Sequence, residues 1–143
     1  MKLLAALAGL LLFFSPPEFA GKWTGTFEDK VFVTLNVQEQ NGVISGTLRH
    51  PTQINTSPSG TLTGISGIFV EEPIGNVKLV GKELRFSTQD EDGEDIKYAL
   101  RLTGTNTADL AFADPPKEYI APKPWKLERG APDKPQTELR RKR

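Results

Sequence analysis

The feature of this chain that most constrains its fold is a two-residue alternation of apolar and polar side chains. It runs from Trp23 to Asp114, and no segment in that stretch shows the 3.6-residue period of an amphipathic helix. In residues 30–39 the alternation places Phe32 on one face and aliphatic side chains on the other, namely Val31, Val33, Leu35 and Val37. This pattern is typical of strands with one buried face, so the sequence predicts an all-β protein.

Turn signals separate the alternating runs. Asn41-Gly42 and Asp92-Gly93 supply the positive φ angles of tight hairpins. Turns recur about every 10–13 residues, which favours an antiparallel up-and-down meander of about seven or eight strands. Closing the sheet would remove its exposed edges, so we expect a closed barrel, with a β-sandwich as the alternative. The expected strands are residues 20–28, 30–39, 42–50, 60–70, 74–80, 82–88, 94–104 and 106–113, with Pro51–Gly60 as the longest loop.

The first twenty residues have the layout of a secretion signal. Lys2 precedes an apolar run of about 12 residues that ends at Phe14, shorter than the ~20 residues of a spanning helix. We therefore expect residues 1–20 to be a signal peptide cleaved near Ala20. The mature chain is expected to have no transmembrane segment and to be secreted or periplasmic. The absence of Cys indicates a bacterial source, because small exported eukaryotic domains usually carry disulfides.

The C-terminal part differs in composition. Residues 114–143 hold six of the eleven prolines, and proline at this density favours extended chain. Some of its side chains are apolar enough to dock on the body, namely Tyr119, Ile120, Trp125 and Leu127. The sequence thus predicts a β-barrel domain over residues 21–113, an ordered extended strap over 114–129 and a mobile basic tail over 130–143.

A Gly-x-Trp motif opens the first expected strand, in Gly21-Lys22-Trp23-Thr24. Here the chain resembles calycin-type barrels, the group of lipocalins, fatty-acid-binding proteins and avidins. The resemblance implies that Trp23 plugs one end of the barrel and that a basic side chain of a late strand, Arg101, packs over it. Avidins line their biotin pocket with several tryptophans, whereas this chain has two. We therefore do not expect biotin as a ligand.

The residue inventory excludes most catalytic and metal chemistry. The chain has no Cys, and its single His is His50. The sequence contains no Gly-x-Ser-x-Gly motif that would present a nucleophilic Ser to this His. The acidic run Asp90–Asp95 does not fit the spacing of a calcium loop, and we interpret it as a solvated hairpin tip. A formal net charge of +0 argues against a nucleic-acid partner. We expect no catalytic residues, no metal and no cofactor.

The class of protein that remains is a binding protein. We expect an exported, non-enzymatic β-barrel that takes a small apolar ligand inside the barrel or at its mouth. The residues expected to line that site all face inward: Trp23, Phe27, Val33, Leu35, Phe86, Tyr98 and Leu100. The alternative is a solid-core interaction module that acts through surface loops or the Pro-rich tail. An apolar void of some 300 Å³ or more would favour the carrier, and a filled interior would favour the interaction module.

Overall fold

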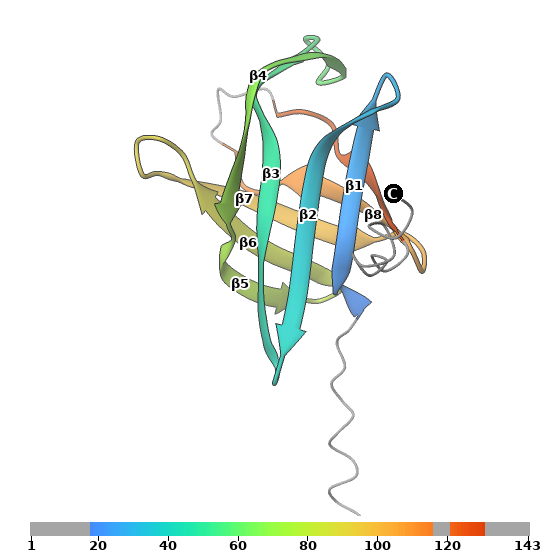
Figure 1. Cartoon of the computed structure of the whole chain (residues 1–143), viewed down its shortest axis with the longest axis vertical. Coiled ribbons are helices and arrows are strands. Elements are labelled where there is room, and N and C mark those ends of the chain that lie inside the picture. Colours follow the sequence, from blue (N-terminus) through green and yellow to red (C-terminus); the bar gives the residue numbers. More distant parts are fainter. Residues whose placement is uncertain (1–17, 116–120, 131–143) are drawn as a thin grey trace, which may run out of the picture.

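The computed structural model describes residues 18–115 and 121–130, which form one antiparallel sheet of nine strands. The strands are β1 (Gly21–Phe27), β2 (Lys30–Gln40), β3 (Val43–Thr56), β4 (Leu62–Pro73), β5 (Gly75–Val80), β6 (Glu83–Gln89), β7 (Asp95–Leu102), β8 (Thr107–Phe112) and β9 (Trp125–Arg129). Their order in the sheet is β4-β3-β2-β1-β9-β8-β7-β6-β5. Figure 1 shows β1–β4 crossing in front of the later strands at a steep angle, so the sheet folds over itself into two layers. The all-β antiparallel fold is confirmed.

The sheet is open between β4 and β5. These strands are its two edges, although only Ile74 separates them in sequence. The Ile74 N–H donates to the Gly46 carbonyl of β3 at 3.0 Å, so this link is bonded to β3 rather than to a β4–β5 ladder. Among the described residues no ladder joins β4 to β5, and a closed barrel is therefore not confirmed.

The core lies between the two layers and follows the alternation on most strands. On β2 the expected inward residues Val33, Leu35 and Val37 are all buried. Val31, however, is 46% exposed and Phe32 is 2% exposed, the reverse of the prediction. The cause is a β-bulge between Gly25 and Thr26, where the partner on β2 changes from Val33 to Val31. The skipped residue, Phe32, is free to turn inward.

The β3–β4 hairpin is longer than the sequence predicted. The segment Pro51–Gly60, expected to be a loop, is mostly strand, because β3 continues to Thr56. Pro51 is accommodated since the β2–β3 ladder ends at Arg49, and Pro51 lies opposite Phe69 of β4 only. Its missing N–H therefore leaves no β2 carbonyl without a donor. The connecting turn is short and is closed by a bond from Ser57 N–H to the Thr61 carbonyl at 2.8 Å.

The ninth strand falls in the segment predicted to be an extended strap. Trp125–Arg129 pairs with both β1 and β8, so it is an integral part of the sheet rather than a strap laid across it. The sheet thus extends beyond the predicted domain end at residue 113. Residues 116–120 of the strap and 131–143 of the predicted mobile tail lie outside the described residues.

Arg129 stacks on Trp23 where β1 meets β9. The guanidinium carbon of Arg129 lies 4.5 Å from the Trp23 ring centroid, and the two residues are register partners. Trp23 is 0% exposed, and its Nε1–H donates to the Phe19 carbonyl at 2.9 Å. A cation stacked on a desolvated indole contributes about 2 kcal/mol.

Hydrogen bonds fix the plane of the Arg129 guanidinium. Its acceptors are the carbonyls of Glu18 (2.8 Å), Ala20 (2.7 Å) and Thr105 (2.5 Å) and the Asn106 side-chain oxygen (3.1 Å). These bonds tie the segment before β1 to the turn between β7 and β8. Gly21 makes room for the Arg129 stem, since it has a φ of +132° and a Cβ there would lie 2.6 Å from Arg129 Cδ.

Arg101 was the wrong choice for the cation over Trp23. It is exposed on β7, where its ladder partners are Glu83 and Asp109. Arg129 takes the position instead. The physical reason is topological: β9 pairs with β1 and places Arg129 directly opposite Trp23, whereas β8 and β9 separate the strand of Arg101 from β1. The sequence did not reveal β9 as a strand.

A chain that begins at Gly21 is expected to be less stable than one that begins at Glu18. Cleavage after Ala20 stays a prediction, but it would remove Phe19, which is 5% exposed, and two of the carbonyls that hold Arg129. Loss of one buried Phe side chain costs about 1.5–3 kcal/mol. Urea unfolding of the two chains measures this difference, and equal midpoints would show that Phe19 contributes nothing.

Replacing Arg129 with Lys is expected to lower the free energy of unfolding, whereas the same change at Arg101 should have little effect. Lys keeps the charge but loses the planar fork that bonds several carbonyls at once. The expected loss for Arg129→Lys is about 1.5–3 kcal/mol. Thermal or urea unfolding of both variants gives the comparison. A larger loss for Arg101→Lys would contradict the structural role assigned to Arg129.

Candidate functional site

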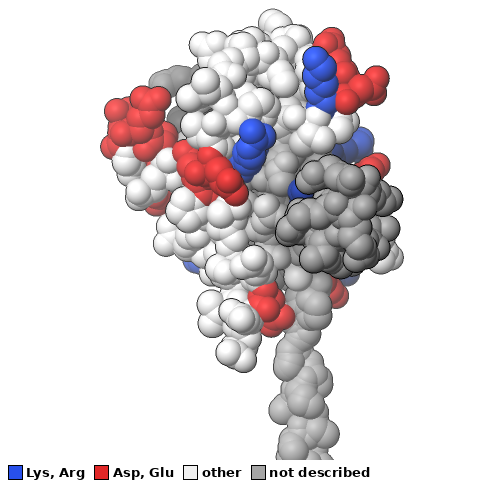
Figure 2. All heavy atoms as spheres, in the orientation of Figure 1, with Lys and Arg blue, Asp and Glu red and all other residues white. Residues whose placement is uncertain are grey.

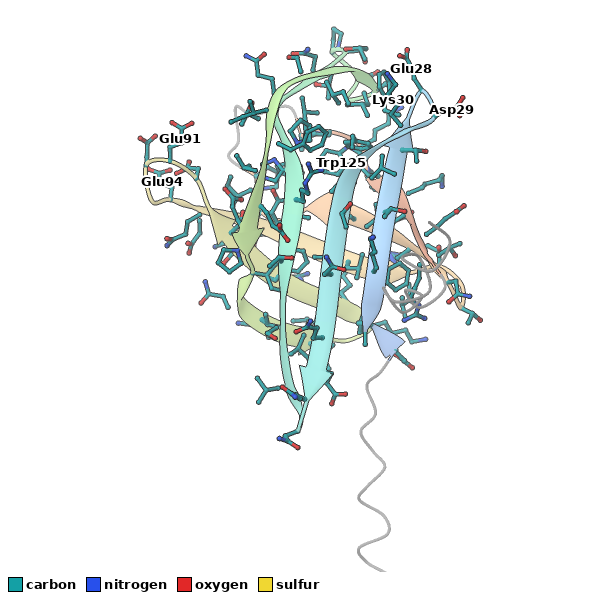
Figure 3. The ribbon with its side chains drawn as sticks, in the orientation of Figure 1. Glu28, Asp29, Lys30, Glu91, Glu94 and Trp125 are labelled. Atoms are coloured by element: carbon teal, nitrogen blue, oxygen red, sulfur yellow. The ribbon has the colours of Figure 1, made fainter. Side chains whose placement is uncertain are left out.

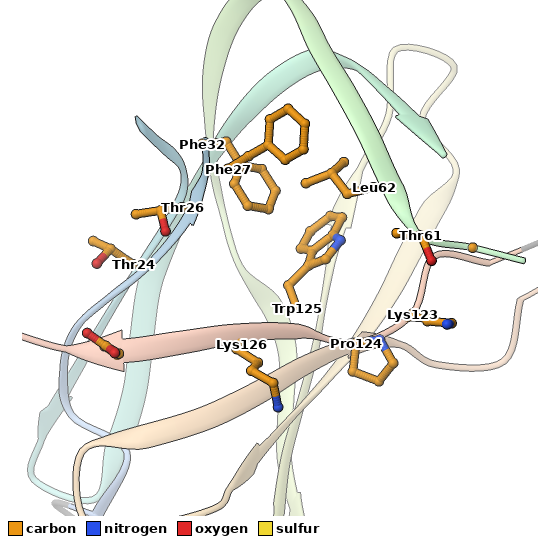
Figure 4. Close-up of a pocket in the computed structure, with 12 residues that line it drawn as sticks. Thr24, Thr26, Phe27, Phe32, Thr61, Leu62, Lys123, Pro124, Trp125 and Lys126 are labelled. Atoms are coloured by element: carbon orange, nitrogen blue, oxygen red, sulfur yellow. The ribbon is translucent and has the colours of Figure 1, made fainter. Parts of the chain in front are cut away.

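A hollow of about 490 Å³ opens where β1 and β9 diverge. The β1–β9 ladder consists of the pairs Trp23–Arg129 and Thr24–Glu128. Beyond these two pairs, the end of β1, up to Phe27, and the start of β9, from Trp125, are not paired with each other. A slot is therefore left between the two strands. Figure 4 shows the residues around it. They are Thr24, Thr26, Phe27, Phe32, Gly60, Thr61, Leu62, Lys123, Pro124, Trp125, Lys126 and Glu128.

The inner wall of this hollow is apolar. The Trp125 indole is 8% exposed and packs edge-to-face against Phe32 at 5.2 Å and against Phe112 at 5.7 Å. Figure 4 shows Phe27 and Leu62 on the same side of the indole as Phe32, across the opening. Aromatic and aliphatic walls of this kind are typical of sites for apolar ligands.

The rim of the hollow is polar. Thr24 and Thr26 come from β1, and Lys126 and Glu128 come from β9. Within the described part of the chain, neither Lys123 nor Lys126 has a carboxylate in salt-bridge range. The rim therefore offers hydroxyl and ammonium donors, with Glu128 as its carboxylate.

The tip of the β3–β4 hairpin forms one wall. Gly60 accepts a hydrogen bond from the Lys123 N–H at 2.9 Å, which fixes the tip against the segment that leads into β9. Gly60 has a φ of +92°, and a Cβ there would lie 2.9 Å from the Ala121 carbonyl. Glycine is therefore needed for this close approach, and the wall is positioned by backbone rather than by flexible side chains.

Two buried side-chain atoms have no hydrogen-bond partner among the described residues, Trp125 Nε1 and Thr88 Oγ1. A buried polar group without a partner costs about 1–3 kcal/mol, so such groups call for an explanation. Trp125 lines the 490 Å³ hollow, and Figure 4 shows the nitrogen edge of its indole turned toward Thr61. Thr88 borders a smaller hollow of about 320 Å³ beside Ile74, at the open seam of the sheet.

The residues predicted to line the ligand site do not surround one cavity. Phe27 lines the 490 Å³ hollow. Phe86 and Tyr98 stack at 5.3 Å and border a separate hollow of about 530 Å³ on the β5–β7 side. The others are fully buried in the core between the layers: Trp23, Val33, Leu35 and Leu100. None of these four side chains lines either hollow.

The wall residues Phe32, Leu62 and Trp125 were missing from the predicted site. Phe32 was assigned to the outer face because the alternation does not reveal the bulge in the β1–β2 ladder. Leu62 lies in the edge strand β4, whose alternation is weak. Trp125 was recognised as apolar enough to dock, but its segment was not predicted to be a strand of the sheet.

The acidic run forms the turn between β6 and β7. The Asp90 side chain accepts bonds from the N–H groups of Asp92 at 2.8 Å and Glu94 at 2.9 Å, so it stabilises the turn itself. Figure 2 shows the tip as a red cluster that projects from the body, and Figure 3 shows Glu91 and Glu94 pointing away from the body. In the described ranges no group of three or more His, Asp or Glu is placed to hold a metal ion.

Comparison of the chain with protein-family models, with curated proteins and with solved structures gives no match in any of the three. The calycin-like assignment therefore stays a prediction. In residues 18–115 and 121–130, no helix has the length and apolar composition needed to cross a bilayer.

Proposed function

We propose that this protein is an exported, non-enzymatic binding protein that takes a small apolar ligand in the hollow between β1 and β9. The observation that carries the proposal is the wall formed by Phe27, Phe32, Leu62 and Trp125. The volume of about 490 Å³ lies within the range of roughly 300–1,000 Å³ that is usual for small-molecule sites. The site is at the end of the folded sheet rather than in its interior.

The architecture we propose is a calycin-like up-and-down barrel with one open seam. Three observations support it. Strands that follow each other in sequence are bonded to each other, except β4 and β5. In addition, β1 is bonded to β9. Trp23 opens the first strand, and a basic side chain of the last strand stacks on it. The first strand begins at Gly21, and the absence of a side chain there makes room for Arg129.

Export and the absence of catalysis belong to the same proposal. The apolar run after Lys2 and the lack of Cys support export. N-terminal sequencing of the protein recovered from the periplasm or the medium tests this. The composition of the hollow favours binding over catalysis, because Glu128 has neither a His nor a second carboxylate beside it in the lining.

Filling the hollow is expected to abolish binding of an apolar probe. Thr26 is exposed on the rim, so Thr26→Tyr places a ring in the slot without disturbing the core. Thr63 of β4 is also exposed and does not line the hollow, so Thr63→Tyr is the matched control. Titration with the fluorescent hydrocarbon-rich amine N-phenyl-1-naphthylamine should give saturable binding to the native protein and to Thr63→Tyr. A loss of about tenfold or more, equal to 1.4 kcal/mol, is expected for Thr26→Tyr. Absence of saturable binding to the native protein would reject the proposal.

The second candidate function is an interaction module, favoured by the edge strand β4. From Leu62 to Val70 this strand carries no charged side chain, and Ile68 is 73% exposed. Edges without charges are templates for strand addition. Antiparallel pairing with a second copy about Ser66 would oppose Leu62 to Val70. The same register would place Glu72 beside Gly60 of the other copy, next to its Lys123, so the charges would match.

Self-association through this edge is expected to depend on Ile68. In the native protein, sedimentation velocity should show a dimer that forms as the concentration rises, and Ile68→Lys should remain monomeric. Val43 is 65% exposed at the start of β3, away from this edge, so Val43→Lys serves as the control for added charge. A native protein that stays monomeric at all concentrations would rule out this candidate.

A further inference from the structure

We infer that the ligand of the β1–β9 hollow carries an acceptor oxygen, carbonyl or carboxylate, that receives a hydrogen bond from Trp125 Nε1–H. The hollow would thus select an apolar molecule with one such oxygen over a pure hydrocarbon of the same shape. This inference rests on the proposed function and specifies its ligand.

The first argument is the unpaired indole nitrogen. Trp125 is 8% exposed, and its Nε1 has no partner among the described residues. An indole N–H only donates, so only an acceptor can satisfy it. The other tryptophan of the chain provides the comparison. Trp23 is 0% exposed, and its Nε1–H is bonded to the Phe19 carbonyl at 2.9 Å.

The second argument is that the direction of this donor is fixed. Phe32 meets the Trp125 ring at an interplanar angle of 80° and Phe112 at 88°, so edge-to-face contacts hold the ring plane. Figure 4 shows the nitrogen edge facing the Thr61 side of the hollow. Nε1 is itself covered, so a ligand oxygen has to displace the groups over it to reach a donor whose direction is already fixed. Sites with such a fixed donor discriminate strongly against analogues that lack the matching group.

The third argument is the polarity of the surroundings. Near the start of β9 the lining includes two basic residues, Lys123 and Lys126, and the hydroxyl of Thr61. Lys126 follows Trp125 on β9 and points to the opposite face of the strand, and Glu128, the carboxylate of the lining, lies further along β9, opposite Thr24. The basic character of the lining near Trp125 suits a ligand oxygen, whether neutral or anionic.

The test compares two ligands that differ in one atom group. 2-Acetylnaphthalene presents a carbonyl oxygen, and 2-isopropenylnaphthalene replaces this oxygen with a CH₂ group of similar shape. The full chain labelled with ¹⁵N gives an indole N–H signal for each of its two tryptophans. The ketone should shift the Trp125 indole proton downfield, and the alkene should not. The Trp23 signal should stay in place, which makes it an internal control. The ketone should also bind about tenfold more tightly than the alkene.

A variant checks the assignment. Trp125→Phe keeps an aromatic ring but removes the N–H, so the preference for the ketone over the alkene should fall to about one while both still bind. If this variant does not fold, the indole signals of the native protein decide the question alone.

A third compound, 2-naphthoate, distinguishes a carboxylate ligand from a neutral carbonyl ligand. Tighter binding than the ketone, weakened by salt, assigns a carboxylate ligand held by the lysines, and weaker binding assigns a neutral carbonyl.

The two proposals fail in different ways. Equal binding of ketone and alkene with an unmoved Trp125 signal would overturn the inference about the acceptor oxygen and leave the apolar binding site standing. If neither compound binds, both the site and its ligand chemistry are wrong.

Discussion

The stacking of Arg129 on Trp23 joins β1 to β9 in the middle of the sheet, and the rest of the arrangement depends on it. It pairs the first strand with the last, and its hydrogen bonds reach back to the residues before β1 and across to the β7–β8 turn. With this contact in place the sheet continues from β4 through β1 and β9 to β5, so one continuous sheet supplies both layers around the core. The buried indole has its own donor satisfied, so the contact combines charge, packing and hydrogen bonding without an unmet polar group.

The same contact lies beside the hollow that we propose as the ligand site. The β1–β9 ladder is short because the strands diverge after Thr24, and the slot that results is the place where Trp125 lacks a partner. The interior, by contrast, is filled by the inward faces of the strands. A chain of aromatic contacts runs from Phe32 through Trp125 and Phe112 to Tyr98. Binding at the end of the fold therefore needs no void inside it, which reconciles a packed core with a hollow of useful size.

Much of the fold could be predicted from the sequence, because a period of two is a direct consequence of strand geometry. The first eight strands followed from it. The exceptions have local causes. A bulge exchanged the exposed and buried positions of Val31 and Phe32. Pro51 was interpreted as part of a loop, although it lies in β3 beyond the end of the β2–β3 ladder. The ninth strand was hidden by the prolines that precede it. Since both Arg129 and Trp125 belong to that strand, its loss from the prediction removed the true partner of Trp23 and the centre of the candidate site together.

The pairing of β1 with β9 has a consequence for how the molecule is made. The strand that covers Trp23 follows it by about a hundred residues, so the centre of the sheet cannot form until that whole length of chain has left the ribosome. Folds dominated by contacts between distant positions form slowly. On the proposal that this protein is exported, slow closure of the sheet would keep the polypeptide extended long enough to be threaded through a translocation channel, and β1 and β9 would pair only after both had arrived on the same side.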